Sequence, residues 1–250
     1  MERMGGGVRQ DDDKAEFFLA QAAAAYKSRH RSSTAVARRQ TQGARAMLKL
    51  AHRFRSGRGV RKDPTKAVEW YARAALRGLP RAHLALGLCY LSGEGVPRDD
   101  VIGARQVERA AKLGCRAAVF NYALLLLQGR GLVRDAVRAR QWFLTGAMNG
   151  DAQCMVNAGA CLAQGVGGEC DDRQARRWFT AASQVPAHAG EAYYNLAILA
   201  RQGRGGADGG EGADAAQRMK ETMRYLRLAA AANSSEAVRI VGKAYRAGLP

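Results

Sequence analysis

Side-chain amides recur at a regular spacing in the second half of the chain. Asn121 and Asn157 lie 36 residues apart, and Asn195 follows 38 residues later. The carboxamide of asparagine both donates and accepts hydrogen bonds, so a row of such groups can bind the backbone of an extended partner segment. An asparagine at such a place can also bond between neighbouring segments of its own chain. We interpret Asn121, Asn157, Asn195 and Lys49, which occupies the matching position nearer the N-terminus, as a candidate partner-binding row.

Positive charge is concentrated near the N-terminus. The chain has 40 Lys and Arg against 22 Asp and Glu, a formal net charge of +18. Segment 27–66 holds 13 of these cations and one acid, Asp63. Such a segment can contact nucleic-acid phosphates, an anionic membrane or an acidic protein, or can remain a solvated linker. The candidate anion-binding residues are Arg29, Arg31, Arg38, Arg39, Arg45, Arg53 and Arg55.

The remaining reactive residue types form no catalytic pattern. The five cysteines include no Cys-x-x-Cys pair, and the four histidines have no metal-ligand spacing. We therefore expect reduced, mostly buried thiols, no metal site, no cofactor and no enzymatic activity. The glycine-rich segment 203–212 lacks the Gly-Lys-Ser/Thr ending of a phosphate-binding loop, so it is interpreted as an enlarged loop between helices.

A repeating framework must position these residues. The pattern Gly-x-Gly begins at Gly57, Gly93, Gly129 and Gly165, each 36 residues after the last, and returns at Gly203. The same period links Asp63, Asp99, Asp135 and Asp171, and it links Trp70, Trp142 and Trp178, with Gln106 in place of a fourth tryptophan. A fixed period of this length indicates an array of structural repeats.

Each repeat has the pattern of two helices. In the segment 82–93, apolar and small residues recur at helical spacing, and Gly93 follows as a helix-ending glycine. Asp63 and Pro64 are typical of the start of a second helix, which carries Ala67 and Trp70 on one face. The sequence has no sustained alternation of apolar and polar residues, so strands are not expected.

The segment 82–114 resembles a Sel-one-like repeat, a relative of the tetratricopeptide repeat. The matching residues are Ala82, Leu86, Gly87, Tyr90, Gly93, Gly95, Val96, Asp99, Ala110, Ala111 and Gly114, with Lys66, Ala67, Trp70 and Tyr71 in the preceding copy. The period of 36 fits this family better than the period of about 34 in tetratricopeptide repeats. The resemblance implies an all-α fold, a right-handed superhelical α-solenoid of antiparallel helix pairs with a concave face.

The resulting domain prediction has three parts. Residues 1–13 form a disordered tail, and residues 14–43 form a capping helix and a basic linker. Residues 44–250 form the solenoid: four full repeats begin near Ala46, Ala82, Ala118 and Cys154, a fifth has an enlarged loop 203–213, and a terminal helix covers 237–248.

The resemblance implies a non-enzymatic adaptor or scaffold, a subunit of a larger assembly that binds other proteins on its concave helix surface. The alternative is a basic structural subunit of a ribonucleoprotein, such as an organellar ribosome or RNA-processing complex, that contacts RNA phosphates through residues 27–66. No apolar stretch is long enough for a transmembrane helix, and no signal peptide is recognised. We expect an intracellular protein, cytoplasmic or organellar, mitochondria included, rather than a secreted one.

Overall fold

The described part of the chain consists of helices and connecting loops. The computed structural model describes residues 33–204 and 214–246, and within them the side chains of residues 33–40 and Tyr245 are not described. No strand occurs in these ranges. The helices are α2 (Ser33–Ser56), α3 (Pro64–Leu76), α4 (Pro80–Ser92), α5 (Asp100–Lys112), α6 (Arg116–Gln128), α7 (Ala136–Met148), α8 (Ala152–Gln164), α9 (Asp172–Ser183), α10 (Pro186–Arg201), α11 (Ala215–Ala231) and α12 (Ser235–Arg246).

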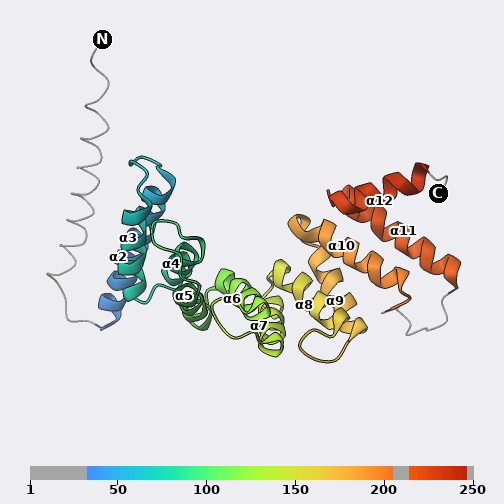
Figure 1. The fold of residues 1–250 in the computed structure, drawn as a ribbon, viewed down its shortest axis with the longest axis horizontal. Coiled ribbons are helices and arrows are strands. Elements are labelled where there is room, and N and C mark those ends of the chain that lie inside the picture. The colour runs from blue at the N-terminus through green and yellow to red at the C-terminus, as the bar shows by residue number, and fades with distance from the viewer. Residues whose placement is uncertain (1–32, 205–213, 247–250) are drawn as a thin grey trace, which may run out of the picture. The chain divides into compact units, whose positions relative to one another are not determined.

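The helices form successive pairs, which confirms the predicted all-α helix-pair repeats (Figure 1). The second helices α3, α5, α7 and α9 begin 36 residues apart. Helix α11 belongs to a fifth pair with α10, and α12 follows; it begins at Ser235, whereas the sequence places the start of this helix at residue 237. Differences of this size are usual at helix ends.

The periodic aspartates start the second helices. The carboxylates of Asp63, Asp99, Asp135 and Asp171 accept hydrogen bonds of 2.8–3.0 Å from backbone N–H groups three residues later. The first N–H groups of a helix have no partner inside it, so these side chains stabilise each helix start. The aspartate period therefore repeats because each pair needs the same cap.

The second glycine of the Gly-x-Gly loop allows close packing between repeats. Gly131 has a φ of +72°, and a Cβ built on it would lie 1.9 Å from the backbone oxygen of Asp100 at the start of α5. At Gly95 the equivalent distance is 2.2 Å, to the backbone oxygen of Pro64. Any other residue would clash there, so these glycines bring each loop against the second helix of the preceding repeat.

One repeat position on the second helix fills the core. Tyr71, Val107, Phe143 and Phe179 occupy it, and each is at most 1 % exposed. The neighbouring tryptophans are half-buried, and Trp70 packs beneath the guanidinium of Arg73, 4.6 Å from the ring centre. Large side chains at one repeated position thus separate the helices, while buried alanines let them approach closely.

The first helix extends further than the sequence interpretation places it. Residues 33–43, expected in the basic linker, are helical and continue directly into the first repeat as part of the 24-residue α2. This stretch has no proline and is rich in Ala, Arg and Gln, which favour helix. The predicted tail 1–13, residues 14–32 of the predicted capping helix and basic linker, and most of the loop 203–213 lie outside the described residues.

The chain forms two compact units. Unit 1 comprises Met1–Tyr122 and Arg130–Val133, and unit 2 comprises Ala123–Gly129 and Arg134–Pro250. Helices α2 to α5 and the first half of α6 belong to unit 1, and helices α7 to α12 belong to unit 2.

Candidate partner-binding site

The first helix of each repeat presents one row of side chains outward. Residues three, four and seven apart share a helix side, and on these helices that side is exposed or half-buried. We define the unit 1 face as Arg45, Lys49, His52 and Ser56 of α2 with Arg81, Leu84, Leu88 and Ser92 of α4. We define the unit 2 face as Gln153, Asn157, Ala160 and Gln164 of α8 with Glu191, Asn195 and Ile198 of α10.

The three asparagines of the predicted row share one geometry. The Nδ2 group of Asn157 donates to the backbone oxygen of Gln153 at 2.8 Å, and that of Asn195 donates to Glu191 at 3.0 Å. In unit 1, Asn121 makes the same bond four residues back, to Ala117 at 2.6 Å. Each amide is therefore held by its own helix, and in the described part of the chain none of the three bonds to a neighbouring repeat. The carboxamide oxygen of each half-buried side chain remains as a hydrogen-bond acceptor.

The same position in the first two repeats carries no amide. Lys49 is exposed on α2, and Ala85 on α4 is only 6 % exposed. At this position the unit 1 face therefore offers one cation, Lys49, where the unit 2 face offers two amides. The two faces share a position in the repeat but not a chemistry.

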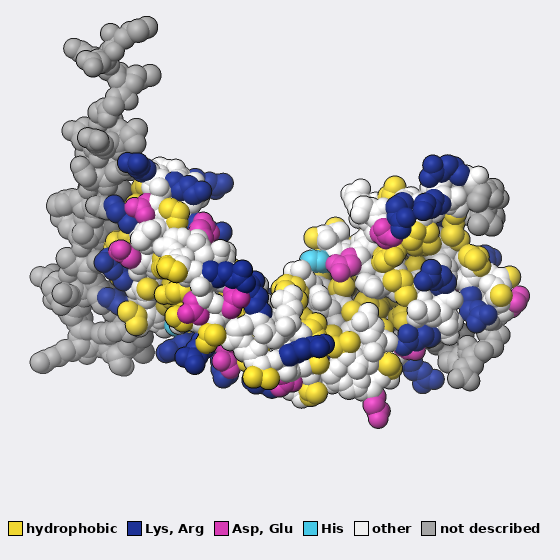
Figure 2. Space-filling view, viewed as in Figure 1, with side chains coloured by type: hydrophobic (Ala, Val, Ile, Leu, Met, Phe, Trp, Pro, Cys, Tyr) yellow, Lys and Arg dark blue, Asp and Glu magenta, His cyan; other side chains and the backbone are white. Residues whose placement is uncertain are grey.

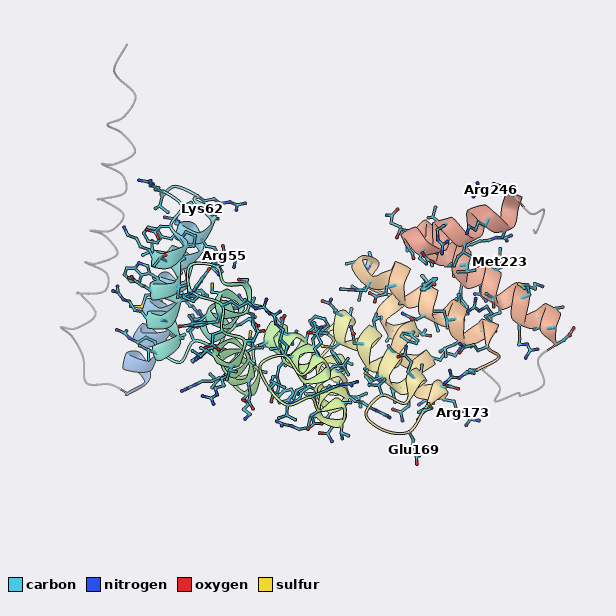
Figure 3. The ribbon with its side chains drawn as sticks, viewed as in Figure 1. Arg55, Lys62, Glu169, Arg173, Met223 and Arg246 are labelled. Carbon is cyan, nitrogen blue, oxygen red and sulfur yellow. The ribbon has the colours of Figure 1, made fainter. Side chains whose placement is uncertain are left out.

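The predicted anion patch is divided by the structure. Arg45 and Arg53 are exposed on α2 and form no ion pair within the described residues. Arg55 is engaged, because its guanidinium lies 3.2 Å from the carboxylate of Glu94. Figure 3 labels Arg55 on α2 and Lys62 in the loop to α3. The backbone of Arg38 and Arg39 lies on α2 without described side chains, and Arg29 and Arg31 lie outside the described residues.

A polar chain links α2 and α3 inside unit 1. The buried hydroxyl of Tyr71 lies 2.8 Å from Nδ1 of His52 and is also hydrogen-bonded to Arg55. Burial, and then the positive charge of Arg55, lower the pKa of His52, which favours its neutral ring. Burial raises the pKa of Tyr71, which keeps the hydroxyl protonated. These partners satisfy the one hydroxyl at a core position that is otherwise valine or phenylalanine.

Two arginines join consecutive repeats. Arg130, between the glycines of its loop, donates to Asp100 at 2.8 Å and to the backbone oxygen of Leu91. Arg204 repeats this in unit 2, with Asp172 at 2.7 Å and the backbone oxygen of Ala163 at 2.5 Å. The guanidinium groups of Arg98 and Arg130 lower the pKa of Asp100 well below its usual range. The sequence analysis did not predict these bridges. The available signal was the middle residue of the Gly-x-Gly loop, which varies between Arg, Glu and Val.

Gln106, which departs from the tryptophan pattern, has a structural partner. Its Oε1 lies 2.7 Å from Nδ1 of His83, which is 5 % exposed on α4. Glutamine replaces tryptophan in the repeat where histidine replaces an apolar core residue, so the two departures compensate each other.

The cysteines and histidines show packing roles. Cys89, Cys115, Cys154 and Cys161 are buried, as expected for most of the thiols, and Cys170 is exposed. Burial raises the pKa of the Cys89, Cys154 and Cys161 thiols, which makes them poor nucleophiles. Within residues 33–204 and 214–246, no group of three or more His, Cys, Asp or Glu has the arrangement of a metal site.

No helix in the described ranges has both the length and the apolar character needed to cross a membrane.

Two solved structures are similar in fold. The crystal structure of a protective antigen of uropathogenic Escherichia coli strains, displaying an SLR fold, has a TM-score of 0.72 at 23 % identity; the match covers 98 % of this chain and 52 % of that one. This chain therefore spans about half the length of that antigen. A Sel1 repeat protein from Oxalobacter formigenes has a TM-score of 0.69 at 24 % identity, covering 96 % and 90 %. No curated protein matches the chain.

The family model of the Sel1 repeat matches residues 1–26, 44–79, 80–115, 116–151 and 152–184. The last four segments coincide with the helix pairs α2/α3 to α8/α9, and the matched segments together make up more than half of the chain. The match confirms the resemblance found in the sequence: the chain belongs to the Sel1 repeat family.

Proposed function

We propose that this chain is a non-enzymatic adaptor that binds partner proteins through its first-helix faces as a subunit of a larger assembly. Sel1 repeat proteins are generally protein-interaction scaffolds. The observation that carries the proposal is the shared geometry of Asn121, Asn157 and Asn195, each held by its own helix through its Nδ2 group.

A held amide is suited to binding. When the Nδ2 group is already bonded to the helix, the side chain has little rotational freedom left to lose on contact with a partner. Its oxygen can accept a hydrogen bond from a peptide N–H, which every partner backbone offers. On the unit 2 face, Asn157 and Asn195 come from α8 and α10, which pack against each other. The two acceptors therefore stand on adjacent helices of one unit.

The proposal is tested by affinity purification with mass spectrometry, using the full chain and the double variant Asn157→Leu with Asn195→Leu. Leucine keeps the size and removes the acceptor, so we expect the captured proteins to be lost. The matched control is Gln141→Leu, an exposed amide on the second helix α7, which should leave capture unchanged. If all three chains capture the same proteins, the unit 2 face is not the binding surface.

Nuclease treatment separates the adaptor from the ribonucleoprotein alternative. An adaptor held by protein contacts keeps its partners when RNase is added during purification. Release of the partners by RNase would replace the proposal with an RNA-held subunit.

A further inference from the structure

We infer that the unit 1 face binds a partner segment that carries acidic residues beside an apolar one. The inference rests on the proposed adaptor function and adds the chemistry of one partner. It concerns Arg45, Lys49, Arg81, Leu84 and Leu88, on the two first helices α2 and α4 that both pack against α3.

The acids of unit 1 are largely committed inside the fold. Asp63 and Asp99 cap helices, and Glu94 pairs with Arg55. Asp100 pairs with Arg98 and Arg130, and Glu108 pairs with Lys112 and bonds to Tyr122. Arg45, Lys49 and Arg81 are exposed and form no ion pair within the described residues. Their charge is therefore available to an external anion.

Lys and Arg dominate the charged surface that Figure 2 shows. An excess of positive charge is compatible with any polyanion, so charge alone does not distinguish nucleic acid from protein as the partner. The apolar residues of the unit 1 face distinguish the two kinds of partner.

Leucines lie among the cations. Leu88 is 37 % exposed and Leu84 is half-buried, both one or two helical turns from Arg81 on the same side of α4. A sugar–phosphate backbone offers little apolar surface to cover them, whereas an apolar peptide side chain offers more. The large exposed hydrophobic residues of the described chain include no aromatic side chain on which bases could stack. These features favour an acidic peptide over a nucleic acid.

The spacing of the cations fits a peptide. Arg45 and Lys49 are four residues apart on one helix, a rise of about 6 Å. Alternate residues of an extended chain are about 6.6 Å apart, and residues four apart on a helix are again about 6 Å apart. Two acids at either spacing can therefore meet both cations at once.

The test is a selection from a random 12-residue peptide display library on the immobilised full chain. We expect enriched peptides to carry at least two acidic residues and a Leu, Met or Phe. Enrichment of peptides without acids, or no enrichment at all, would overturn the inference.

Variants locate the binding surface for the enriched peptides, measured by fluorescence anisotropy of labelled copies. The pair Arg45→Glu with Lys49→Glu should weaken binding at least about tenfold, and Leu88→Ser should weaken it about threefold. The matched control is Arg105→Glu with Arg109→Glu, two exposed cations four residues apart on the second helix α5. An equal loss in the control pair would show general charge attraction and contradict the inference. Circular dichroism confirms that each variant is folded.

Two further measurements distinguish an acidic peptide from other partners and the unit 1 face from the unit 2 face. If a 12-nucleotide polyuridine or a 12-base-pair DNA duplex binds more tightly than the best peptide and loses affinity with Arg45→Glu and Lys49→Glu, the face is a nucleic-acid surface and the inference is wrong. If the peptides depend on Asn157 and Asn195 instead of Arg45 and Lys49, the inference fails while the adaptor function stands.

Discussion

Unit 1 and unit 2 have the same framework and different outward faces. In both, aspartates cap the second helices and glycines admit the next loop. The unit 1 face carries Arg45, Lys49 and Arg81, whereas the unit 2 face carries amides. The comparison shows that the repeat fixes where a side chain is displayed and leaves its chemistry free. One chain therefore presents two surface chemistries on one repeat framework.

The cores differ as well. Tyr71 in unit 1 bonds through its hydroxyl to His52 and Arg55. At the equivalent place in unit 2, Phe179 has no hydroxyl, and the positions matching His52 and Arg55 are Ala160 and Ala163. The buried hydroxyl thus occurs only where its partners are present. Four predictions test these differences between the two units.

The largest expected effect is on unit 2. Phe179→Ala removes a side chain that is 1 % exposed and lies against Gly159, so the free energy of unfolding should fall by about 3–5 kcal/mol. Urea titration followed by circular dichroism measures it. Unfolding unchanged from the parent chain would mean that this ring does not support the unit.

The second prediction places the tyrosine of the unit 1 core at the equivalent position of unit 2. Phe179→Tyr buries a hydroxyl where the two partner positions are alanine, so unit 2 should lose about 1–3 kcal/mol of unfolding free energy. The same titration applies, with Thr180→Ser on the exposed side of α9 as the control. A neutral result would show that unit 2 accommodates the hydroxyl without those partners.

A smaller effect depends on pH and is confined to unit 1. The pKa of His52 is lowered in the folded chain, so the unfolded chain binds more protons once the pH falls below about 6.5. The stability contributed by neutral His52 is therefore present above that pH and is lost as the pH falls towards the folded pKa.

Thermal unfolding between pH 7.5 and 5 measures this dependence. His52→Gln, which cannot titrate, should flatten it, and Tyr71→Phe should keep part of it because burial persists. If the parent and His52→Gln chains show the same pH slope, His52 is not its source.

The smallest effect concerns the faces. Lys49→Asn should change the unfolding free energy by no more than about 0.5 kcal/mol, because Lys49 is exposed and asparagine at this place bonds to its own helix. Differential scanning calorimetry measures the change. A large loss of unfolding free energy would mean that the unit 1 face is part of the folding framework and that its chemistry is not free to vary.

The sequence predicts the framework well because its determinants are local. The spacing of Asp63, Asp99, Asp135 and Asp171 reflects one helix start per repeat, and the structure confirms all four as caps. The helical extension over residues 33–43 was not predicted, because Gly43 stands inside α2 without ending it. A glycine within a helical pattern lowers helix propensity but does not by itself end the helix.

The contacts of the face and core depend on side-chain direction, which periodicity does not contain. The row Asn121, Asn157 and Asn195 was found from spacing, but its bonds to the preceding turn required coordinates. The bridges from Arg130 and Arg204 join residues 30 and 32 positions away, so they leave no local pattern.

Those bridges make the loop contacts of successive repeats unequal. The second and fourth of these contacts are closed by Arg130 and Arg204 on a carboxylate, and the first by Glu94 with the charges reversed. The third has Val166 in the middle of its loop, and there Arg140 donates only to the backbone oxygen of Glu169. The loop contacts that hold consecutive repeats therefore differ in the charges they use from one repeat to the next.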